Sequence, residues 1–211
     1  FYILIICTIL LMAPFLFVLT IKESYYPAFW KLIRGWAHVL VYGMGFRIDK
    51  QIDEVLDREK SYMFCPNHAS LMDPFVLIVL SKNPIVFVGK KELVKIPIFG
   101  FFYKKGVIMV DRSSPESRKK VYEEAKKRLK NGISLGIFPE GLVPTENIIL
   151  APFKNGAFSL AIEFQIPIVP QVYYDGKRLF SWDFWKGGPG TIRVHQHKFI
   201  ETSDLQMQHV E

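Results

Sequence analysis

The chain has 211 residues, of which 50% are hydrophobic, 15% aromatic and 22% charged; this fits one or at most two folded domains and excludes a disordered protein. Two cysteines are too few for a disulfide-stapled fold or a four-cysteine zinc site. The net charge of +7 is concentrated in residues 82–130, where 14 basic and 5 acidic side chains predict a surface for anionic partners.

The first 21 residues form an apolar segment without a charged side chain. About 20 apolar residues are enough to cross the hydrocarbon core of a bilayer. The numbering starts at Phe1 and not at a methionine, so we expect the natural chain to begin earlier. A cleaved signal peptide fits poorly, because the apolar run is long and no small-x-small cleavage site follows it. Pro14 predicts a kink, which leaves both a straight span and a helix embedded in one leaflet open.

A second amphiphilic segment follows and is rich in the aromatic residues that concentrate where a bilayer meets water. These residues are Tyr25, Tyr26, Trp30, Trp36 and Tyr42. We therefore predict that residues 1–44 are a membrane-associated two-helix segment and that residues 45–211 form an α/β domain. The alternative for residues 1–44 is a pair of ordinary buried helices.

Beyond residue 45, short β-branched or aromatic runs alternate with helical stretches. Strands are predicted at 46–52, 61–66, 85–89, 107–110, 133–138, 166–174 and 191–200. Helices are predicted at 74–81, 97–104, 115–131 and 155–165, the third of them capped by Ser113 or Ser114 and ended by Gly132. This alternation predicts an α/β fold whose mixed, largely parallel sheet is flanked by helices. In such sheets the chemistry lies in the loops at one edge.

Two candidate nucleophiles are weakened by their positions. Ser134 lies in a G-x-S-x-G pattern, but the pattern follows a predicted helix and runs into a strand, which reverses the order found in a serine-hydrolase elbow. Cys65 lies within a predicted strand, where cysteine usually acts as a small buried hydrophobe. We expect neither side chain to attack a substrate.

His195 and His197 share one face of a predicted strand, which is a spacing that metal ligands can use. No acidic or cysteine triplet close to them in the sequence completes a metal site. We therefore expect two surface or sheet histidines and no bound metal.

A histidine and a carboxylate five residues apart lie across a predicted strand-to-helix turn, in the segment NHASLMDP at 67–74. If Asp73 accepts the Nδ1 proton of His68, the ring nitrogen Nε2 is free to act as a base. The alternative is structural, because Asp73 and Pro74 also suit the first positions of a helix and His68 could be an ordinary loop residue.

Five short blocks in matching order support the catalytic interpretation. They are NHASLMD at 67–73, GKKELVKIPIFG at 89–100, GVIMVDR at 106–112, FPEG at 138–141 and IPIVP at 166–170. Together with PFKNGAF at 152–158, these blocks resemble the glycerolipid acyltransferase family, and most closely its 1-acyl-sn-glycerol-3-phosphate acyltransferases. The resemblance extends over residues 60–172.

The resemblance implies the transfer of a fatty acyl group from a thioester to the sn-2 hydroxyl of lysophosphatidic acid, in phospholipid biosynthesis. His68 would take the proton of the hydroxyl and Asp73 would orient the imidazole, with no covalent enzyme intermediate. Arg112 would bind the phosphate of the acceptor, with help from Lys90 and Lys105.

Two residues of the FPEG block complete the implied site. Glu140 would bind a glycerol hydroxyl or set its loop through a salt bridge. Backbone N–H groups near a helix start or at Gly141 would face the thioester oxygen as negative charge develops on it.

The expected partners follow from the same resemblance. They are a phospholipid bilayer, a lyso-lipid acceptor, and acyl-carrier protein or coenzyme A as the thioester donor, with no metal and no further cofactor. We expect the chain at the cell membrane, with its active site facing the cytoplasm and residues 82–130 facing anionic headgroups. Nucleic acid is not an expected partner, because no nucleic-acid motif accompanies the basic segment.

One position departs from the family pattern. The family usually continues FPEG with T-R-S, and that arginine helps to hold the acceptor phosphate, whereas this chain continues with Leu142-Val143-Pro144. Two alternatives therefore stay open. One is the same chemistry on another lyso-lipid or an amino-acid lipid, and the other is a membrane lipid-binding protein without turnover.

Overall fold

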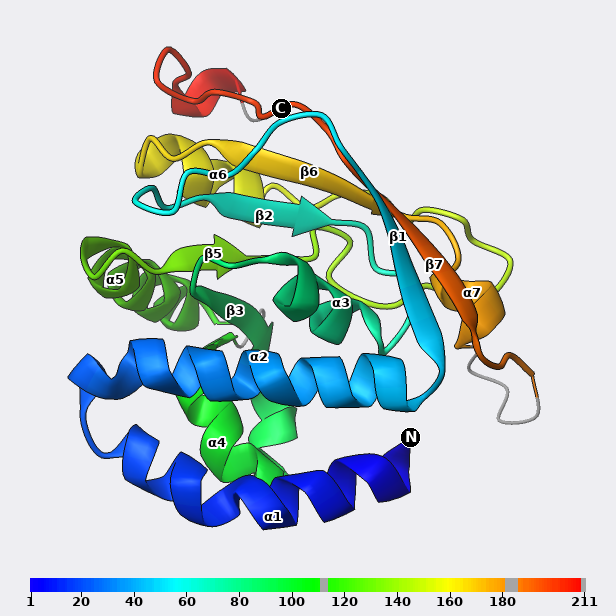
Figure 1. Ribbon diagram of the computed structural model, residues 1–211. Helices are drawn as coiled ribbons and strands as arrows, with labels where there is room; N and C mark the ends of the chain where they lie inside the picture. Colours follow the sequence, from blue (N-terminus) through cyan, green and yellow to red (C-terminus); the bar gives the residue numbers. More distant parts are fainter. Residues whose placement is uncertain (111–113, 181–185, 210–211) are drawn as a thin grey trace.

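The structure is a computed structural model that describes residues 1–110, 114–180 and 186–209 (Figure 1). Its strands are β1 (Phe46–Ile52), β2 (Met63–Pro66), β3 (Ile85–Lys90), β4 (Val107–Val110), β5 (Ser134–Gly136), β6 (Ile168–Tyr173) and β7 (Gly190–Gln196). Its α-helices are α1 (Tyr2–Thr20), α2 (Tyr26–Gly43), α3 (Asp73–Leu80), α4 (Phe99–Gly106), α5 (Pro115–Lys130), α6 (Gly156–Glu163) and α7 (Gly176–Leu179). Short 3₁₀ helices lie at Glu23–Tyr25 (η1), Lys91–Lys95 (η2) and Met207–His209 (η3).

The described strands form one sheet in the order β1-β7-β6-β2-β5-β3-β4. Neighbouring strands are parallel except for β6 and β7, which are antiparallel. This arrangement confirms the predicted α/β fold with a mixed, largely parallel sheet. Because β2, β3, β4, β5 and β6 run in one direction, their carboxyl ends share one edge of the sheet, and the loops that follow them meet there.

Helices cover both faces of this sheet. In the central strand β2, Met63 and Phe64 are both fully buried and point to opposite faces, because side chains alternate along a strand. Met63 packs in a cluster with Ala125 of α5 and Ala161 of α6. Phe64 packs in a second cluster with side chains of α2, α3 and β7.

Helix α2 packs into the core through its aromatic face. Trp30 and Trp36 are 4% and 6% exposed, and Tyr26 is 1% exposed. The hydroxyl of Tyr26 donates to the backbone oxygen of Ile85 in β3, at 2.9 Å. The prediction that these three side chains lie at a bilayer surface is therefore wrong, and the alternative of a buried helix is correct for α2. A buried aromatic ring with a satisfied polar tip suits a core as well as it suits a membrane interface.

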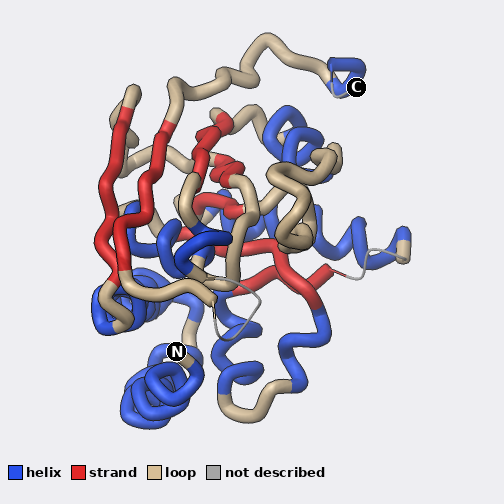
Figure 2. Tube along the Cα trace, turned by 90° about the vertical axis from the view of Figure 1, so that its right-hand side faces the viewer, coloured by secondary structure: helices blue, strands red, loops and turns tan. Residues whose placement is uncertain are grey.

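Helix α1 is different, because most of its apolar side chains are exposed. Among the described helices it is the one that is long and apolar enough to cross a membrane, and it continues through Pro14. The indole N–H of Trp36 donates to the hydroxyl of Thr8 at 2.7 Å, which holds α1 against α2. Figure 2 shows α1 at one end of the molecule, outside the layer of strands.

Candidate active site

The loop after β2 brings His68 against Asp73, the first residue of α3. Nδ1 of His68 lies 3.0 Å from Oδ2 of Asp73. The Asp73 side chain is 2% exposed and the His68 side chain is 16% exposed. The contact expected between the two side chains is present, at the carboxyl edge of the sheet, with a buried carboxylate behind a partly exposed imidazole.

The Asp73 carboxylate folds back over the loop that precedes it. Oδ2 accepts from the backbone N–H groups of Ala69 and Ser70, at 2.5 and 2.7 Å, as well as from His68. Oδ1 accepts from the hydroxyl of Ser70 at 2.8 Å. A carboxylate in this setting only accepts hydrogen bonds, so Nδ1 of His68 is the protonated ring nitrogen and Nε2 is the basic one.

The imidazole of His68 also stacks on an aromatic ring from the FPEG block. The ring of Phe138, which follows β5, lies 4.1 Å from the His68 ring between centroids, with 22° between the planes. Phe87 of β3 continues the stack at 6.5 Å from Phe138. The stacked ring restricts rotation of the imidazole and shields one of its faces from water. This support was not predicted, although an aromatic residue at the end of the strand next to β2 is the signal that could have indicated it.

Glu140 of the same block is a buried brace for the histidine. It is 1% exposed, its Oε1 accepts from the backbone N–H of His68 at 2.6 Å, and its Oε2 accepts from the backbone N–H of Ala151 at 2.7 Å. Both oxygens are thus occupied by backbone groups. Of the two predicted roles of Glu140, the contacts fit the one that sets its loop, although backbone hydrogen bonds stand in place of the predicted salt bridge. Glu140 ties the FPEG loop to the loop that carries His68.

Two further residues hold this loop in place, and the sequence analysis assigned a role to neither. The side-chain amide of Asn67 donates to the backbone oxygen of Tyr173 and accepts from its N–H, at 3.2 and 2.7 Å, which extends the β2–β6 ladder by one step. Gly176, the first residue of α7, packs directly on the loop. A Cβ at this position would lie 3.1 Å from Oδ1 of Asp73.

The other predicted substrate-binding residues fall in different places. Lys90 is the last residue of β3, so its backbone lies at the carboxyl edge with His68. Gly141 is at this edge too, at a φ of +74° that favours glycine, but its N–H donates to the oxygen of Phe138 at 2.9 Å. That N–H is therefore committed to a turn and does not face a thioester oxygen. Arg112 lies outside the described residues.

Lys105 is at the opposite edge of the sheet. It precedes β4, which runs parallel to β3, whereas His68 follows β2. Its ammonium group lies 3.2 Å from Oε1 of Glu23, and Arg128 lies 3.2 Å from Oε2 of the same carboxylate. Burial raises the pKa of Glu23, but the hydrogen bond from Lys105 and the charge of Arg128 outweigh burial, so the net pKa of Glu23 is lowered. The prediction that Lys105 binds substrate is corrected: it ties α4 to η1.

The two rejected nucleophiles are both buried. Ser134 is fully buried, and its hydroxyl accepts from the backbone N–H of Tyr62 at 3.1 Å. Cys65 is buried in β2, and burial raises the pKa of its thiol to about 12. At neutral pH this cysteine is a protonated thiol and not a thiolate nucleophile.

A carboxylate distant in the sequence lies beside His195 and His197 in the fold, which the sequence did not indicate. Asp53, which follows β1, lies with its Oδ2 2.8 Å from Nε2 of His195. The three side chains come together because β1 and β7 pair in parallel, although 142 residues separate Asp53 from His195. The cluster lies outside the His68 site.

Known proteins are similar to this chain in sequence and in fold. The model of the family described as Acyltransferase matches residues 47–174. The 1-acyl-sn-glycerol-3-phosphate acyltransferase of Cocos nucifera is 32% identical over 68% of this chain and 47% of its own length. The enzyme of the same name from Saccharomyces cerevisiae is 31% identical over 88% of this chain and 62% of its own length. The chain thus spans about half to two thirds of these relatives.

A solved structure shares the fold. It is the 1-acyl-sn-glycerophosphate (LPA) acyltransferase PlsC from Thermotoga maritima, which superposes with a TM-score of 0.81 over 99% of this chain and 85% of that chain, at 19% identity. The family model covers more than half of the chain, including β2, the His68 loop, the FPEG block and β6. This chain belongs to the acyltransferase family.

Proposed function

We propose that the protein transfers a fatty acyl group from acyl-carrier protein or acyl-CoA to the sn-2 hydroxyl of lysophosphatidic acid, giving phosphatidic acid. The observation that carries this proposal is the 3.0 Å contact between Nδ1 of His68 and the buried Asp73, which leaves Nε2 as the basic ring nitrogen. The acceptor is the one in the names of the curated relatives.

His68 acts as a general base in this reaction. Nε2 takes the proton of the acceptor hydroxyl while the oxygen attacks the thioester carbonyl, and Asp73 stabilises the imidazolium that forms. The C–O bond forms, the C–S bond breaks, and the imidazolium returns its proton to the leaving thiolate. A thioester is already activated, so neither Ser134 nor Cys65 is needed as a nucleophile. Proton transfer by a positioned base contributes roughly 10²–10⁴-fold to a rate.

The acceptor phosphate is bound, in this proposal, by Arg112 with Lys90. Lys90 ends β3, so its backbone belongs to the edge that carries His68. Arg112 lies outside the described residues, and its part in the proposal comes from the match of the GVIMVDR block at 106–112 to the family pattern. A guanidinium group offers a planar pair of donors that fits a phosphate. Losing this contact should raise the KM for a phosphate-bearing acceptor and leave a phosphate-free acceptor unaffected.

Membrane attachment through α1 is the second part of the proposal. Its exposed apolar side chains continue onto η2 and α4, where Leu93, Ile96, Ile98 and Phe101 are also exposed. The ring of Phe101 stacks on Phe17 of α1, with centroids 5.9 Å apart. Within residues 1–44, α1 therefore contacts lipid while α2 fixes it to the α/β domain of residues 45–211. We place the protein at the cell membrane, with the active site and the basic residues 82–130 on the cytoplasmic side, where acyl-carrier protein and coenzyme A are found.

A second acceptor class is favoured by one observation. The segment after FPEG, from Leu142 to Glu146, contains no arginine or lysine, whereas the family pattern has an arginine there. The same chemistry on another lyso-lipid or an amino-acid lipid is therefore the competing function.

One assay separates these possibilities. The purified full chain in detergent is supplied with acyl-CoA or acyl-carrier protein and a panel of lyso-lipids with and without a phosphomonoester, and products are measured. The matched variants are His68→Ala and His38→Ala, since His38 lies on α2 and bonds to the oxygen of Arg34 in its own helix. Product from lysophosphatidic acid with wild type and His38→Ala, but not with His68→Ala, supports the proposal. Preference for a phosphate-free acceptor establishes the alternative acceptor, and binding of lipid without any product contradicts acyl transfer altogether.

A further inference from the structure

We propose that Asp53, His195 and His197 bind a divalent transition-metal ion of the Zn²⁺ type. Each side chain offers one ligand atom, and the three atoms lie within 4.8 Å of one another. Oδ2 of Asp53 is 2.8 Å from Nε2 of His195 and 3.8 Å from Nδ1 of His197. With metal–ligand bonds of about 2.0–2.2 Å, the ligand atoms of a tetrahedral zinc site lie about 3.3 Å apart. The two spacings from Asp53 lie on either side of this value, and the two imidazole nitrogens lie within 4.8 Å of each other. Side-chain rotations that bring the two rings closer would complete the site.

The backbone presents these ligands from two fixed segments. β1 and β7 pair in parallel up to their last residues, so the chain continues from β1 with Asp53 beside His197. The N–H of Asp53 donates to the oxygen of Gln196 at 2.9 Å, and the N–H of His197 donates to the oxygen of Pro170 at 3.0 Å. Ligands held on paired strands lose little conformational freedom when a metal binds, which favours affinity.

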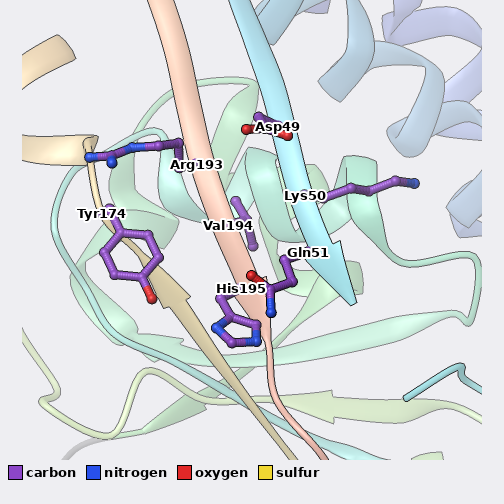
Figure 3. Close-up of a pocket in the computed structure, with 7 residues that line it drawn as sticks. All are labelled: Asp49, Lys50, Gln51, Tyr174, Arg193, Val194 and His195. Carbon is purple, nitrogen blue, oxygen red and sulfur yellow. The ribbon is translucent and has the colours of Figure 1, made fainter. Parts of the chain in front are cut away.

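A neighbouring amide orients the carboxylate. The side-chain N–H of Gln51 donates to Oδ1 of Asp53 at 3.2 Å, so Oδ2 is the oxygen that faces the histidines. Gln51 lies opposite His195 in the β1–β7 register, and Figure 3 shows both side chains on the same face of the two strands. His195 borders a hollow of about 320 Å³ that Tyr174 and Arg193 also line, which leaves room for water or an anion as a fourth ligand. A hydrogen bond that orients a metal ligand is a regular feature of metal sites.

A simple surface hydrogen bond explains this cluster less well. One histidine would satisfy Asp53, but here two imidazole rings lie 3.8 Å apart between centroids, and a nitrogen of each approaches the same carboxylate oxygen. A bound dication would accept all three ligand atoms at once. Two imidazole nitrogens favour Zn²⁺ over Mg²⁺ or Ca²⁺, which prefer oxygen ligands. The bound ion would clamp the end of the edge strand β1 to β7.

The experiment measures metal binding directly. The full chain in detergent, with any affinity tag removed, is stripped with a chelator and titrated with Zn²⁺ and separately with Mg²⁺, by calorimetry and by metal analysis after desalting. The variants are Asp53→Asn, His195→Ala and His197→Ala, with His38→Ala as the matched control that removes an imidazole elsewhere. Gln51→Ala tests the orienting amide. Melting curves without metal confirm that each variant is folded, which these partly exposed side chains should permit.

We expect one Zn²⁺ per chain and no Mg²⁺ binding under the same conditions. Each ligand variant should weaken Zn²⁺ binding at least tenfold, Gln51→Ala should weaken it about tenfold, and His38→Ala should leave it unchanged. Zn²⁺ at about 100 times the Kd of wild type should raise the Tm of wild type by roughly 5 °C or more, and should raise the Tm of the ligand variants by about half as much or less. The proposal is overturned if wild type binds no Zn²⁺ saturably, or if the three ligand variants bind it as tightly as wild type does.

Discussion

Asp73→Asn should remove the charge behind His68 while keeping the geometry of the loop. In the native protein Oδ2 accepts three N–H groups, and Oδ1 accepts the hydroxyl of Ser70. An asparagine can keep its carbonyl oxygen in the place of Oδ2 and its amide nitrogen in the place of Oδ1. The Ser70 hydroxyl then turns and accepts instead of donating, because a hydroxyl can do either. The His68 tautomer is preserved, and the negative charge is lost.

The size of the effect follows from the distance between the two groups. The imidazolium forms only as the acceptor proton is transferred, so the attraction to Asp73 belongs to the transition state and not to the resting enzyme. Two unit charges 3.0 Å apart, at an effective dielectric constant near 20, attract by about 5 kcal/mol. The amide dipole of asparagine retains part of this attraction. We therefore expect kcat to fall about 10³-fold, with KM changed by less than about threefold.

The assay is the release of free thiol from acyl-CoA at saturating acceptor, with kcat and KM measured separately. Ser70→Ala is the matched control, because it removes the donor to Oδ1 and leaves Oδ2 and the charge in place. This control should lower kcat by less than tenfold. If folded Asp73→Asn keeps kcat within tenfold of wild type, or changes KM alone, then the carboxylate does not stabilise an imidazolium and the mechanism is refuted.

Three other predictions concern the surroundings of the pair. Glu140→Gln places an amide N–H against one of two buried backbone N–H donors. The substitution should therefore lower the free energy of unfolding by about 2 kcal/mol, lower the Tm by roughly 4–8 °C and reduce kcat. An unchanged melting curve would contradict the role of Glu140 as a brace. Gly176→Ala puts a methyl group 3.1 Å from Oδ1 of Asp73, so kcat should fall while lipid binding, measured with vesicles, is retained. Burial raises the pKa of Cys65 to about 12 from an ordinary value near 9, so its stabilising contribution is complete below pH 9 and is lost as the pH rises toward 12. Denaturant melts at pH 8 and 10.5 should show a larger loss of stability for wild type than for Cys65→Ala, and equal losses would show that the thiol is not buried.

The elements that the sequence predicts well are those determined by neighbouring residues. The strands at 46–52 and 107–110 have the predicted bounds, and the helix predicted at 115–131 spans Pro115–Lys130. Its cap is also as predicted, with the Ser114 hydroxyl accepting from the N–H of Ser117 at 3.2 Å. The short helices η2 and α7 were not predicted. Four or five residues are too few to show a helical period, and such helices depend on contacts from the rest of the fold.

The face of α2 could not be assigned from sequence for a related reason. Trp and Tyr on an amphipathic helix suit a bilayer interface and a protein core equally, because both surroundings bury the ring and leave a polar tip to be satisfied. What decides the outcome is a partner distant in the chain, such as the Ile85 carbonyl that accepts from Tyr26. The residues that contact His68 are likewise far from it in the sequence. Glu140 is 72 residues away, and it meets His68 only because β5 pairs beside β2.

The FPEG block and the residues after it therefore divide into two parts. Phe138 and Glu140 hold His68 in place, and in the proposed function the residues after Gly141 are left to contact the acceptor. Phe138 stacks on the imidazole of His68, and Glu140 holds the backbone of the same residue, so the start of the block maintains the base whatever the acceptor is. The chain departs from the family pattern at Leu142, Val143 and Pro144, and the stack on His68 and the hydrogen bond to its N–H come from Phe138 and Glu140 instead. A substitution after Gly141 can thus alter phosphate binding without disturbing the base. Under the proposed function, the missing arginine therefore bears on the choice of lyso-lipid and leaves the contact between His68 and Asp73 intact.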